Sequence, residues 1–321
     1  MKTKTQLVQF IILLFVISNP LFAQQDSIYK PIIWSTDWSP KGKLIAIGDN
    51  KDTLKIYSER SLKPYKSFPI DNTITRVKWH PSKNLIAVAT QNSKDKSGII
   101  NVETDEKIEL NEISSSGARG MDWNYTGEYL AVGDNDGQVL IYNTKGELIR
   151  KFINQTNSTK SITALDWHPN KNILITVSDK IRFFDIEGNL LNTLKHRTED
   201  VLILSVAWHK SGAFFVTGDY GDEKDQSLLQ YWSEQGKLIR SIDSSKGEYR
   251  NLAWNPKGNR LATASDTLRI WDTKGNLISE GNEKNHFLWG VSWNKQGNKI
   301  ITSAQSLLLW NDKAEKIETV E

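Results

Sequence analysis

The sequence has no cysteine among its 321 residues. This absence excludes a disulfide framework, a cysteine–zinc site and a lipid attached to an N-terminal cysteine. The formal net charge is only +3, and lysine and arginine form no block along the chain. Nucleic acid is therefore not an implied partner. The chain also lacks a P-loop, a GxGxxG motif and a nucleophile elbow, so no familiar catalytic motif points to an enzyme.

Long apolar runs are scarce as well, and the one that exists lies at the N-terminus. Two lysines precede residues 7–17, which are almost entirely apolar, and Ala23 offers a small residue at a cleavage point. This order is typical of a secretory signal peptide, which we assign to residues 1–23. The run is shorter than the ~20 apolar residues of a membrane span, and an uncleaved anchor is the alternative. We expect an exported protein, periplasmic or at the cell surface, whose mature part is residues 24–321 and has no membrane span.

Tryptophan, by contrast, is abundant and regularly placed. Seven of the twelve tryptophans open similar phrases, the first of which reads WSPKGKLIAIGD. Successive members are 39 to 46 residues apart, and the set comprises Trp38, Trp79, Trp123, Trp167, Trp208, Trp254 and Trp293. A period of about 40–45 residues indicates one supersecondary unit repeated along the chain, rather than a series of unrelated domains.

Each repeat predicts four strands. The first strand ends at the tryptophan and has an apolar residue two positions earlier, so that both side chains share one face. Proline or glycine follows within four residues, as in Pro40 and Gly42, and supplies a hairpin turn. The second strand is apolar at consecutive positions, as in residues 44–47, which indicates burial on both faces. The third strand ends in an aromatic and a polar residue, and the fourth is polar, as expected of an outer edge.

Seven such units predict an all-β fold, a seven-bladed β-propeller of four-stranded antiparallel blades. We expect a single domain with blades at residues 32–70, 73–114, 117–156, 160–198, 200–243, 247–281 and 285–321. The fourth strand of the last blade would come from residues 316–320. Only about eight mature residues precede the first strand, which is short for an additional strand. We therefore expect blade seven to pack on blade one without an N-terminal strand completing it.

The repeat pattern resembles the WD40 family over essentially all of the mature chain. Trp271 and Asp272 form a WD dipeptide, and turn aspartates like those of the family follow the second strands at Asp134, Asp179 and Asp266. The family's Gly-His before the first strand is absent, because His196 and His286 stand in that region without a preceding glycine. The resemblance implies a propeller whose network joining histidine, Ser/Thr, Asp and Trp is incomplete.

Three histidines directly follow repeat tryptophans, namely His80, His168 and His209. The same position carries serine or asparagine in the other repeats, at Ser39, Asn124, Asn255 and Asn294. Metal ligands must converge to ~2 Å from one ion, whereas these three residues belong to different blades. We therefore interpret the histidines as polar turn residues.

Three aspartates directly precede repeat tryptophans, namely Asp37, Asp122 and Asp166. A ring of carboxylates around the central channel would bind a cation. Alternatively, each aspartate accepts a hydrogen bond from the backbone, as buried polar groups must, and Lys78 partly neutralises the set. We favour the second interpretation and expect neither a metal nor another cofactor.

The blades differ at the fourth residue before the repeat tryptophan, which is Trp34, Thr75, Arg119, Thr163, Leu204, Arg250 or Trp289. Tryptophan, tyrosine and arginine dominate interaction hot spots. We therefore predict a binding site at this rim, formed by Trp34, Arg119, Tyr249, Arg250, His286, Phe287 and Trp289. Alternatively, Trp34 and Trp289 share the strand parity of the repeat tryptophans and fill the core between blades one and seven.

Together these features favour a non-catalytic, exported propeller that serves as a protein-interaction scaffold, because loops held on a rigid ring provide binding surfaces. One alternative is a propeller enzyme, such as a lactonase, lyase or hydrolase, with its site at the channel mouth. Another is a propeller that binds glycans or peptides. We expect the protein to be a monomer with a protein partner.

Overall fold

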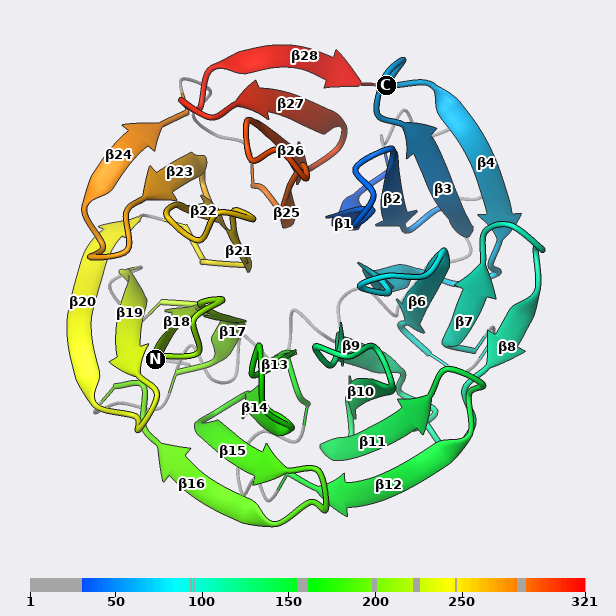
Figure 1. Ribbon diagram of the computed structural model, residues 1–321, viewed down its shortest axis with the longest axis horizontal. Helices are drawn as coiled ribbons and strands as arrows, with labels where there is room; N and C mark the ends of the chain where they lie inside the picture. Colours follow the sequence, from blue (N-terminus) through cyan, green and yellow to red (C-terminus); the bar gives the residue numbers. More distant parts are fainter. Residues whose placement is uncertain are drawn as a thin grey trace, which may run out of the picture. The chain divides into compact units, whose positions relative to one another are not determined.

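Twenty-eight strands make up the part of the chain that the structure describes. The computed structural model describes residues 31–320 apart from residues 93, 95, 155–160, 198–200, 222–225, 246 and 282–286. Its strands form seven four-stranded antiparallel sheets around a central channel (Figure 1). The predicted all-β, seven-bladed propeller is therefore confirmed. The expected signal peptide at residues 1–23 lies outside the described residues, which contain no helix long and apolar enough to cross a membrane.

Every sheet uses four consecutive strands, ordered from the channel outward. The innermost strands are β1 (Ile33–Trp38), β5 (Ile74–Trp79), β9 (Ala118–Trp123), β13 (Ala164–Trp167), β17 (Ile203–Trp208), β21 (Asn251–Trp254) and β25 (Gly290–Trp293). The second strands are β2 (Leu44–Asp49), β6 (Leu85–Thr90), β10 (Tyr129–Asp134), β14 (Ile173–Val177), β18 (Phe214–Asp219), β22 (Leu261–Ala264) and β26 (Lys299–Ser303). The third strands are β3 (Thr53–Ser58), β7 (Gly98–Asn101), β11 (Gln138–Asn143), β15 (Ile181–Asp185), β19 (Ser227–Ser233), β23 (Leu268–Trp271) and β27 (Leu307–Asn311). The outer strands are β4 (Pro64–Pro69), β8 (Lys107–Glu109), β12 (Leu148–Ile153), β16 (Leu190–Leu194), β20 (Leu238–Ser245), β24 (Leu277–Glu280) and β28 (Lys316–Val320).

The core lies between neighbouring sheets. Second strands such as β2 and β6 are buried at almost every position, whereas the outer strand β16 is largely exposed. Each apolar cluster combines two adjacent blades, and one of them joins Val139 and Ile141 to Trp167 of the next blade. Six of the seven repeat tryptophans are buried and Trp254 is half-buried. The tryptophan that opens each sequence repeat therefore packs between neighbouring sheets.

The ring closes by contact of blade seven with blade one. The outer strand β28 pairs with β27, so the last blade is completed by C-terminal residues, as expected. One cluster contains Ile33 and Trp38 of blade one together with Leu309 and Val320 of blade seven. The backbone N–H of Ile33 also donates to the Ala304 carbonyl at 2.8 Å. This seam is therefore held by the same packing as the others.

The three turn histidines connect consecutive blades. His80 Nε2 lies 2.9 Å from the Gly127 carbonyl, His168 Nε2 lies 3.3 Å from the Gly212 carbonyl, and His209 Nε2 lies 2.6 Å from the Gly258 carbonyl. The Nδ1 atom of His80 accepts the backbone N–H groups of Ser82 and Lys83. This pattern assigns the proton to Nε2, which donates to the next blade. The interpretation as polar turn residues is confirmed.

The WD40-like network is partly formed in blade five. Trp232 Nε1 donates to Thr217 Oγ1 at 2.8 Å, and His196 Nδ1 lies 3.3 Å from Asp219 Oδ2. Neither His196 Nδ1 nor His196 Nε2 makes a hydrogen bond among the described residues. The network is incomplete, as predicted, although histidine and aspartate meet without a glycine before the histidine.

Candidate interaction site at the channel mouth

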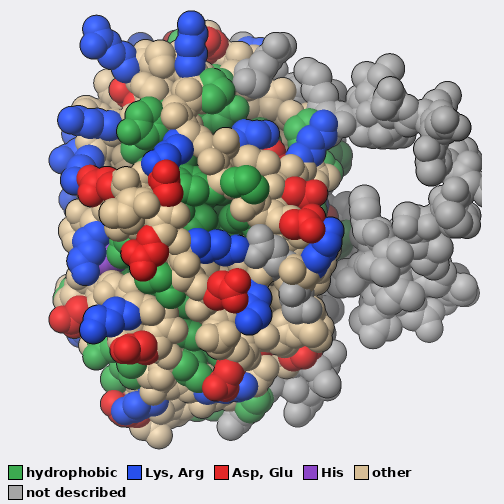
Figure 2. Space-filling model, turned by 90° about the vertical axis from the view of Figure 1, so that its right-hand side faces the viewer, with side chains coloured by type: hydrophobic (Ala, Val, Ile, Leu, Met, Phe, Trp, Pro, Cys, Tyr) green, Lys and Arg blue, Asp and Glu red, His purple; other side chains and the backbone are tan. Residues whose placement is uncertain are grey.

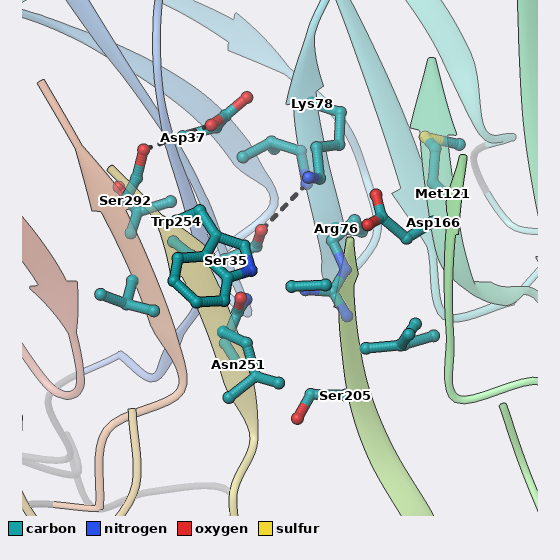
Figure 3. A pocket seen from close by; sticks show the side chains of 18 of the residues that line it. Ser35, Asp37, Arg76, Lys78, Met121, Asp166, Ser205, Asn251, Trp254 and Ser292 are labelled. Carbon is teal, nitrogen blue, oxygen red and sulfur yellow. Dashed lines mark hydrogen bonds between the residues drawn. The ribbon is translucent and has the colours of Figure 1, made fainter. Parts of the chain in front are cut away.

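A cavity of about 350 Å³ occupies the channel and is lined by the innermost strands of the blades. Asp37 and Lys78 lie toward one end of it, and Asn251 and Ser205 lie toward the other, with Arg76 between them (Figure 3). The charged layer formed by Asp37, Lys78, Asp122 and Asp166 is called the aspartate layer below.

Backbone groups of the neighbouring blades satisfy the aspartate layer. Asp37 Oδ2 accepts the N–H of Trp79 at 2.8 Å, and Asp166 Oδ2 accepts the N–H of Trp208 at 2.6 Å. Asp122 accepts that of Trp167 at 3.4 Å. This geometry confirms that the aspartates are backbone acceptors. No group of three or more His, Cys, Asp and Glu side chains is placed to hold a metal ion in the described part of the chain.

Burial and neighbouring charges shift the pKa values of the aspartate layer. Burial raises the pKa of Asp37, although Lys78 opposes this shift. Burial and the charge of Asp122 raise the pKa of Asp166 well above its usual range. Burial would lower the pKa of Lys78, but Asp122 and Asp37 raise it, and Lys78 Nζ lies 3.4 Å from Asp122. One ammonium group thus stabilises the charge of several carboxyl groups.

A β-bulge changes the direction of the residue four positions before the repeat tryptophan. In the pairing of β1 with β2, Ile33 faces Asp49 and Ser35 faces Gly48, so Trp34 is the extra residue. The same irregularity occurs in β5, β9 and β17. A bulge interrupts the alternation of side chains and re-aims one of them. The parity argument therefore fails for Trp34 because of the bulge. Neither Trp34 nor Trp289 belongs to a core cluster.

Four of the predicted site residues meet at the end of the channel where the innermost strands begin. The rings of Trp34 and Trp289 have centroids 4.4 Å apart. The Arg250 guanidinium lies 3.7 Å from the Trp289 ring centroid, and the Arg119 guanidinium lies 5.7 Å from that of Trp34. These contacts have cation–π geometry. Blades one, three, six and seven contribute one residue each, and we call the group the mouth cluster.

The mouth cluster is half-buried and carries positive charge. Burial lowers the pKa of Arg119, and the nearby charge of Arg250 lowers it further. Burial also lowers the pKa of Arg250, while Glu248, with which it forms an ion pair, raises it. The same burial raises the pKa of Glu248. Among the described residues, a carboxylate compensates the charge of Arg250, whereas the contact of the Arg119 guanidinium is the aromatic face of Trp34.

Three other predicted site residues do not join the mouth cluster. Tyr249 is fully buried between blades five and six, in a cluster with Leu252 and Trp271, so its assignment to a binding surface is wrong. Its neighbour Arg250 points the other way because side chains alternate along an extended chain. Phe287 is 64% exposed but makes no ring contact with the cluster among the described residues. His286 lies outside the described residues.

Sequence reasoning missed Arg76 and Glu248. Arg76 stands three residues before Trp79, where the other blades carry the small or polar residues Ser35, Gly120, Ala164, Ser205, Asn251 and Gly290. An arginine at such a position is the signal that would have found it. Arg76 lines the cavity, and its Nε donates to the Arg119 carbonyl at 3.2 Å. It therefore connects the mouth cluster to the cavity.

Comparisons with known proteins agree with this architecture. The family model of the WDR19 first beta-propeller matches residues 34–206, more than half of the chain, and the model of the WD domain, G-beta repeat, matches residues 188–228 and 236–272. Protein FIZZY-RELATED 3 of Arabidopsis thaliana is 23% identical over 248 residues, which are 74% of this chain and 49% of that protein. Eukaryotic translation initiation factor 3 subunit I of Sclerotinia sclerotiorum is 23% identical over 258 residues, or 73% of this chain and 76% of that protein.

A further relative is Retinoblastoma-binding-like protein E of Dictyostelium discoideum, which is 22% identical over 254 residues, or 69% of this chain. The chain spans about half the length of this protein and of FIZZY-RELATED 3, but three quarters of the initiation factor subunit. Seven four-stranded blades, the repeated tryptophan phrase and the match to the family model lead to one conclusion. The chain belongs to the WD40-repeat β-propeller family.

Proposed function

We propose that this protein is a non-catalytic scaffold that binds another protein at the mouth cluster. The observation that carries the proposal is the convergence of two tryptophans and two arginines from four blades on one end of the channel. Tryptophan and arginine contribute most strongly to protein-binding hot spots. One relative is by name a subunit of a larger factor, which supports a role in assembly.

The alternative of an enzyme at the channel mouth has less support. A propeller hydrolase or lyase needs histidine or carboxylate side chains that are free to act on a substrate. The carboxylates of the aspartate layer instead accept backbone N–H groups, and the turn histidines bond to backbone carbonyls of the next blade. These groups hold the blades together, which favours a scaffold.

Affinity capture tests the proposal. The wild-type protein and the double variant Trp34→Ala/Trp289→Ala would be used as bait in a lysate of the native envelope, with quantitative mass spectrometry of retained proteins. Ile239→Ala is the matched control, because Ile239 is an exposed apolar residue on β20. We expect a partner retained by the wild type and the control but lost by the double variant. Equal retention by all three baits would contradict the proposal.

We further propose that the scaffold acts after export, in the periplasm or at the cell surface. Support comes from the order of charge, apolar run and small residue in residues 1–23, which is typical of a signal peptide. Mass spectrometry of the protein purified from its native source would test this. A mature N-terminus at Gln24 in the envelope fraction is expected, and an intact residue 1–23 segment in the cytoplasmic fraction would contradict it.

A further inference from the structure

The mouth cluster and Arg76 place three guanidinium groups close together. Arg76 Nε donates to the Arg119 carbonyl at 3.2 Å, and the charge of Arg250 acts on Arg119. Glu248 forms the ion pair of Arg250. The Arg119 guanidinium has neither a hydrogen bond nor an ion pair with any described residue, and its contact is the Trp34 ring. Among the described residues, Glu248 is the carboxylate that pairs with the mouth cluster, and it pairs with Arg250 rather than Arg119.

The aspartate layer and the mouth cluster differ in how their positive charges are compensated. In the aspartate layer, Lys78 is matched by Asp122 at 3.4 Å and by Asp37. At the mouth, burial and the like charge of Arg250 both lower the pKa of Arg119. Burial also lowers the pKa of Arg76; Asp122 and Asp37 oppose this shift and the charge of Arg119 adds to it. Holding like charges together in a half-buried place costs stability. An anionic ligand would remove this cost.

The shape of the site selects among anions. The guanidinium groups of Arg119 and Arg250 lie against the indole rings of Trp34 and Trp289, which limits their orientations. An oriented guanidinium presents a fork of N–H donors that matches a carboxylate bidentately. Arg76 and Arg250 also line the cavity of about 350 Å³, so a side chain can enter beside them. Trp34 Nε1 is a buried donor without a partner among the described residues.

We propose that the mouth cluster, together with Arg76, binds the carboxylates of an acidic peptide segment of the partner protein. The inference rests on the proposed function and specifies the chemistry of that partner. Arg119 and Arg76 are the anion contacts, Arg250 shares its charge between Glu248 and the ligand, and the paired indoles contact the neighbouring apolar part of the peptide.

The side of the molecule shown in Figure 2 and the small net charge argue against a nucleic-acid ligand. Nucleic-acid binding requires a continuous basic track that follows successive phosphates. Figure 2 shows lysine and arginine interspersed with aspartate and glutamate on the visible face, and the net charge is only +3. A short acidic segment fits the mouth cluster better than a long polyanion.

Peptide selection tests the inference with a defined probe. A phage-displayed library of random dodecapeptides would be selected on the purified propeller, and the selected peptides would be measured by fluorescence anisotropy. We expect enrichment of aspartate and glutamate. Replacing these residues by their amides, or Arg119→Gln in the protein, should each weaken binding by about tenfold or more, since a charge-assisted pair is lost. Arg119→Lys keeps the charge but loses the fork, so we expect an intermediate loss.

The control is Arg150→Gln, the same change at an exposed arginine of β12 that pairs with Glu187. It should leave peptide binding unchanged. The melting temperature of Arg119→Gln should equal or exceed that of the wild type because a repulsion is removed, which separates lost binding from lost folding. Selected peptides without acidic enrichment, or equal binding by Arg119→Gln, would overturn the inference.

Two further outcomes would also overturn it. Tighter binding of a twelve-nucleotide oligothymidine than of any selected peptide would identify a nucleic-acid site. Binding of phosphoserine peptides without binding of their glutamate counterparts would identify a phosphate site. If a captured protein depends on Trp34 and Trp289 but is retained equally by Arg119→Gln, the inference fails while the proposed function stands.

Discussion

The tryptophans of this chain have two physical roles. The repeat tryptophans are wedged between sheets, and Trp38 lies in the cluster that joins blades one and seven. Trp34 lies four residues earlier in the same strand, yet a bulge turns it away from that cluster and toward Trp289. Side chains so close in sequence therefore differ in what they stabilise. One fixes the ring, and the other forms part of a surface.

Alanine substitutions should separate these roles. Trp38→Ala leaves a cavity in the core and should lower the free energy of unfolding by about 3–5 kcal/mol. Trp34→Ala removes a half-buried ring that contacts the Trp289 ring and the Arg119 guanidinium, so we expect a loss of about 1–2 kcal/mol. Denaturant titration of both variants would measure the difference. Equal losses would mean that Trp34 is a core residue after all.

The turn histidines predict a pH dependence of stability. Burial lowers the pKa of His80 and His168 below the ordinary 6.5, although the bonds to Gly127 and Gly212 oppose the shift. A histidine whose pKa is lower in the folded than in the unfolded state is harder to protonate in the folded state. Protonation therefore favours unfolding. The contribution of the neutral histidine to stability is complete above about pH 6.5 and is lost as the pH falls through the folded-state pKa. The free energy of unfolding should therefore decrease between pH 7 and pH 5.

The control for this dependence exists within the chain, because asparagine fills the same position in blade three. Asn124 Oδ1 accepts the N–H of Tyr129, and its Nδ2 donates to Asn172. The variant His80→Asn/His168→Asn keeps a polar turn without a titrating group. Denaturant titrations from pH 5 to 7 should show a smaller decrease for this variant than for the wild type. An unchanged slope would assign the pH dependence to other groups.

The hairpin turns between first and second strands depend on glycine for two reasons. Gly127 and Gly297 have φ angles of 75° and 68°, a region that residues with a side chain rarely adopt. A Cβ atom at Gly127 would also overlap the His80 ring of the preceding blade. At Gly297 the nearest atom, Cδ of Pro256, is 3.5 Å away. The first turn therefore needs glycine for backbone conformation and for space, and the second for conformation alone.

Alanine substitutions at Gly297 and Gly127 would measure the cost of backbone strain and the cost of steric overlap. Gly297→Ala should destabilise the protein by about 1–2 kcal/mol through backbone strain. Gly127→Ala should cost about 1–3 kcal/mol more, because the His80 ring must move. Adding His80→Ser, which restores the residue type of blade one at Ser39, should recover most of the difference. Thermal or denaturant unfolding checks this order, and equal effects of the two single substitutions would contradict it.

The repetition of the sequence explains why the fold was predictable and the site only partly so. Seven copies of one phrase define the wedge tryptophans, the turns and the buried second strands, because each copy repeats the same periodicity. A bulge has no comparable signature, so strand alternation left burial of Trp34 in the core as an alternative to the predicted binding site. Tyr249 was assigned to the rim through its neighbour Arg250, although alternation buries one of the two. The meeting of Arg119 with Arg250 depends on ring closure, which no single blade encodes.

The ring as a whole is a chain of nearest-neighbour contacts. Each blade bonds to the blade that follows it: Asp37 accepts the N–H of Trp79, and His80 Nε2 donates to the Gly127 carbonyl. Ser292 Oγ accepts the N–H of Trp38 at 3.0 Å, which extends the same relation across the seam. Every blade also consists of four consecutive strands. The contacts between other neighbouring blades and the contacts between blades seven and one should therefore contribute similarly to the stability of the ring.

Circular permutation tests this equivalence of blades. Joining the C-terminus to residue 31 by a short Gly/Ser linker and opening the chain between Asn111 and Glu112, both exposed, leaves all seven blades intact. Repeat architectures are stabilised by each unit and its interfaces with neighbours, so we expect a monomeric ring with a melting temperature close to that of the wild type. Opening the chain within a blade, between Lys41 and Gly42, separates β1 from β2. We expect this permutant to have a lower melting temperature than the one opened between Asn111 and Glu112. Calorimetry and size-exclusion chromatography would show this order. If the chain opened at 111 unfolds or loses the mouth cluster's binding while the chain opened at 41 retains both, the seam is a special element, and the ring is not a chain of equivalent blades.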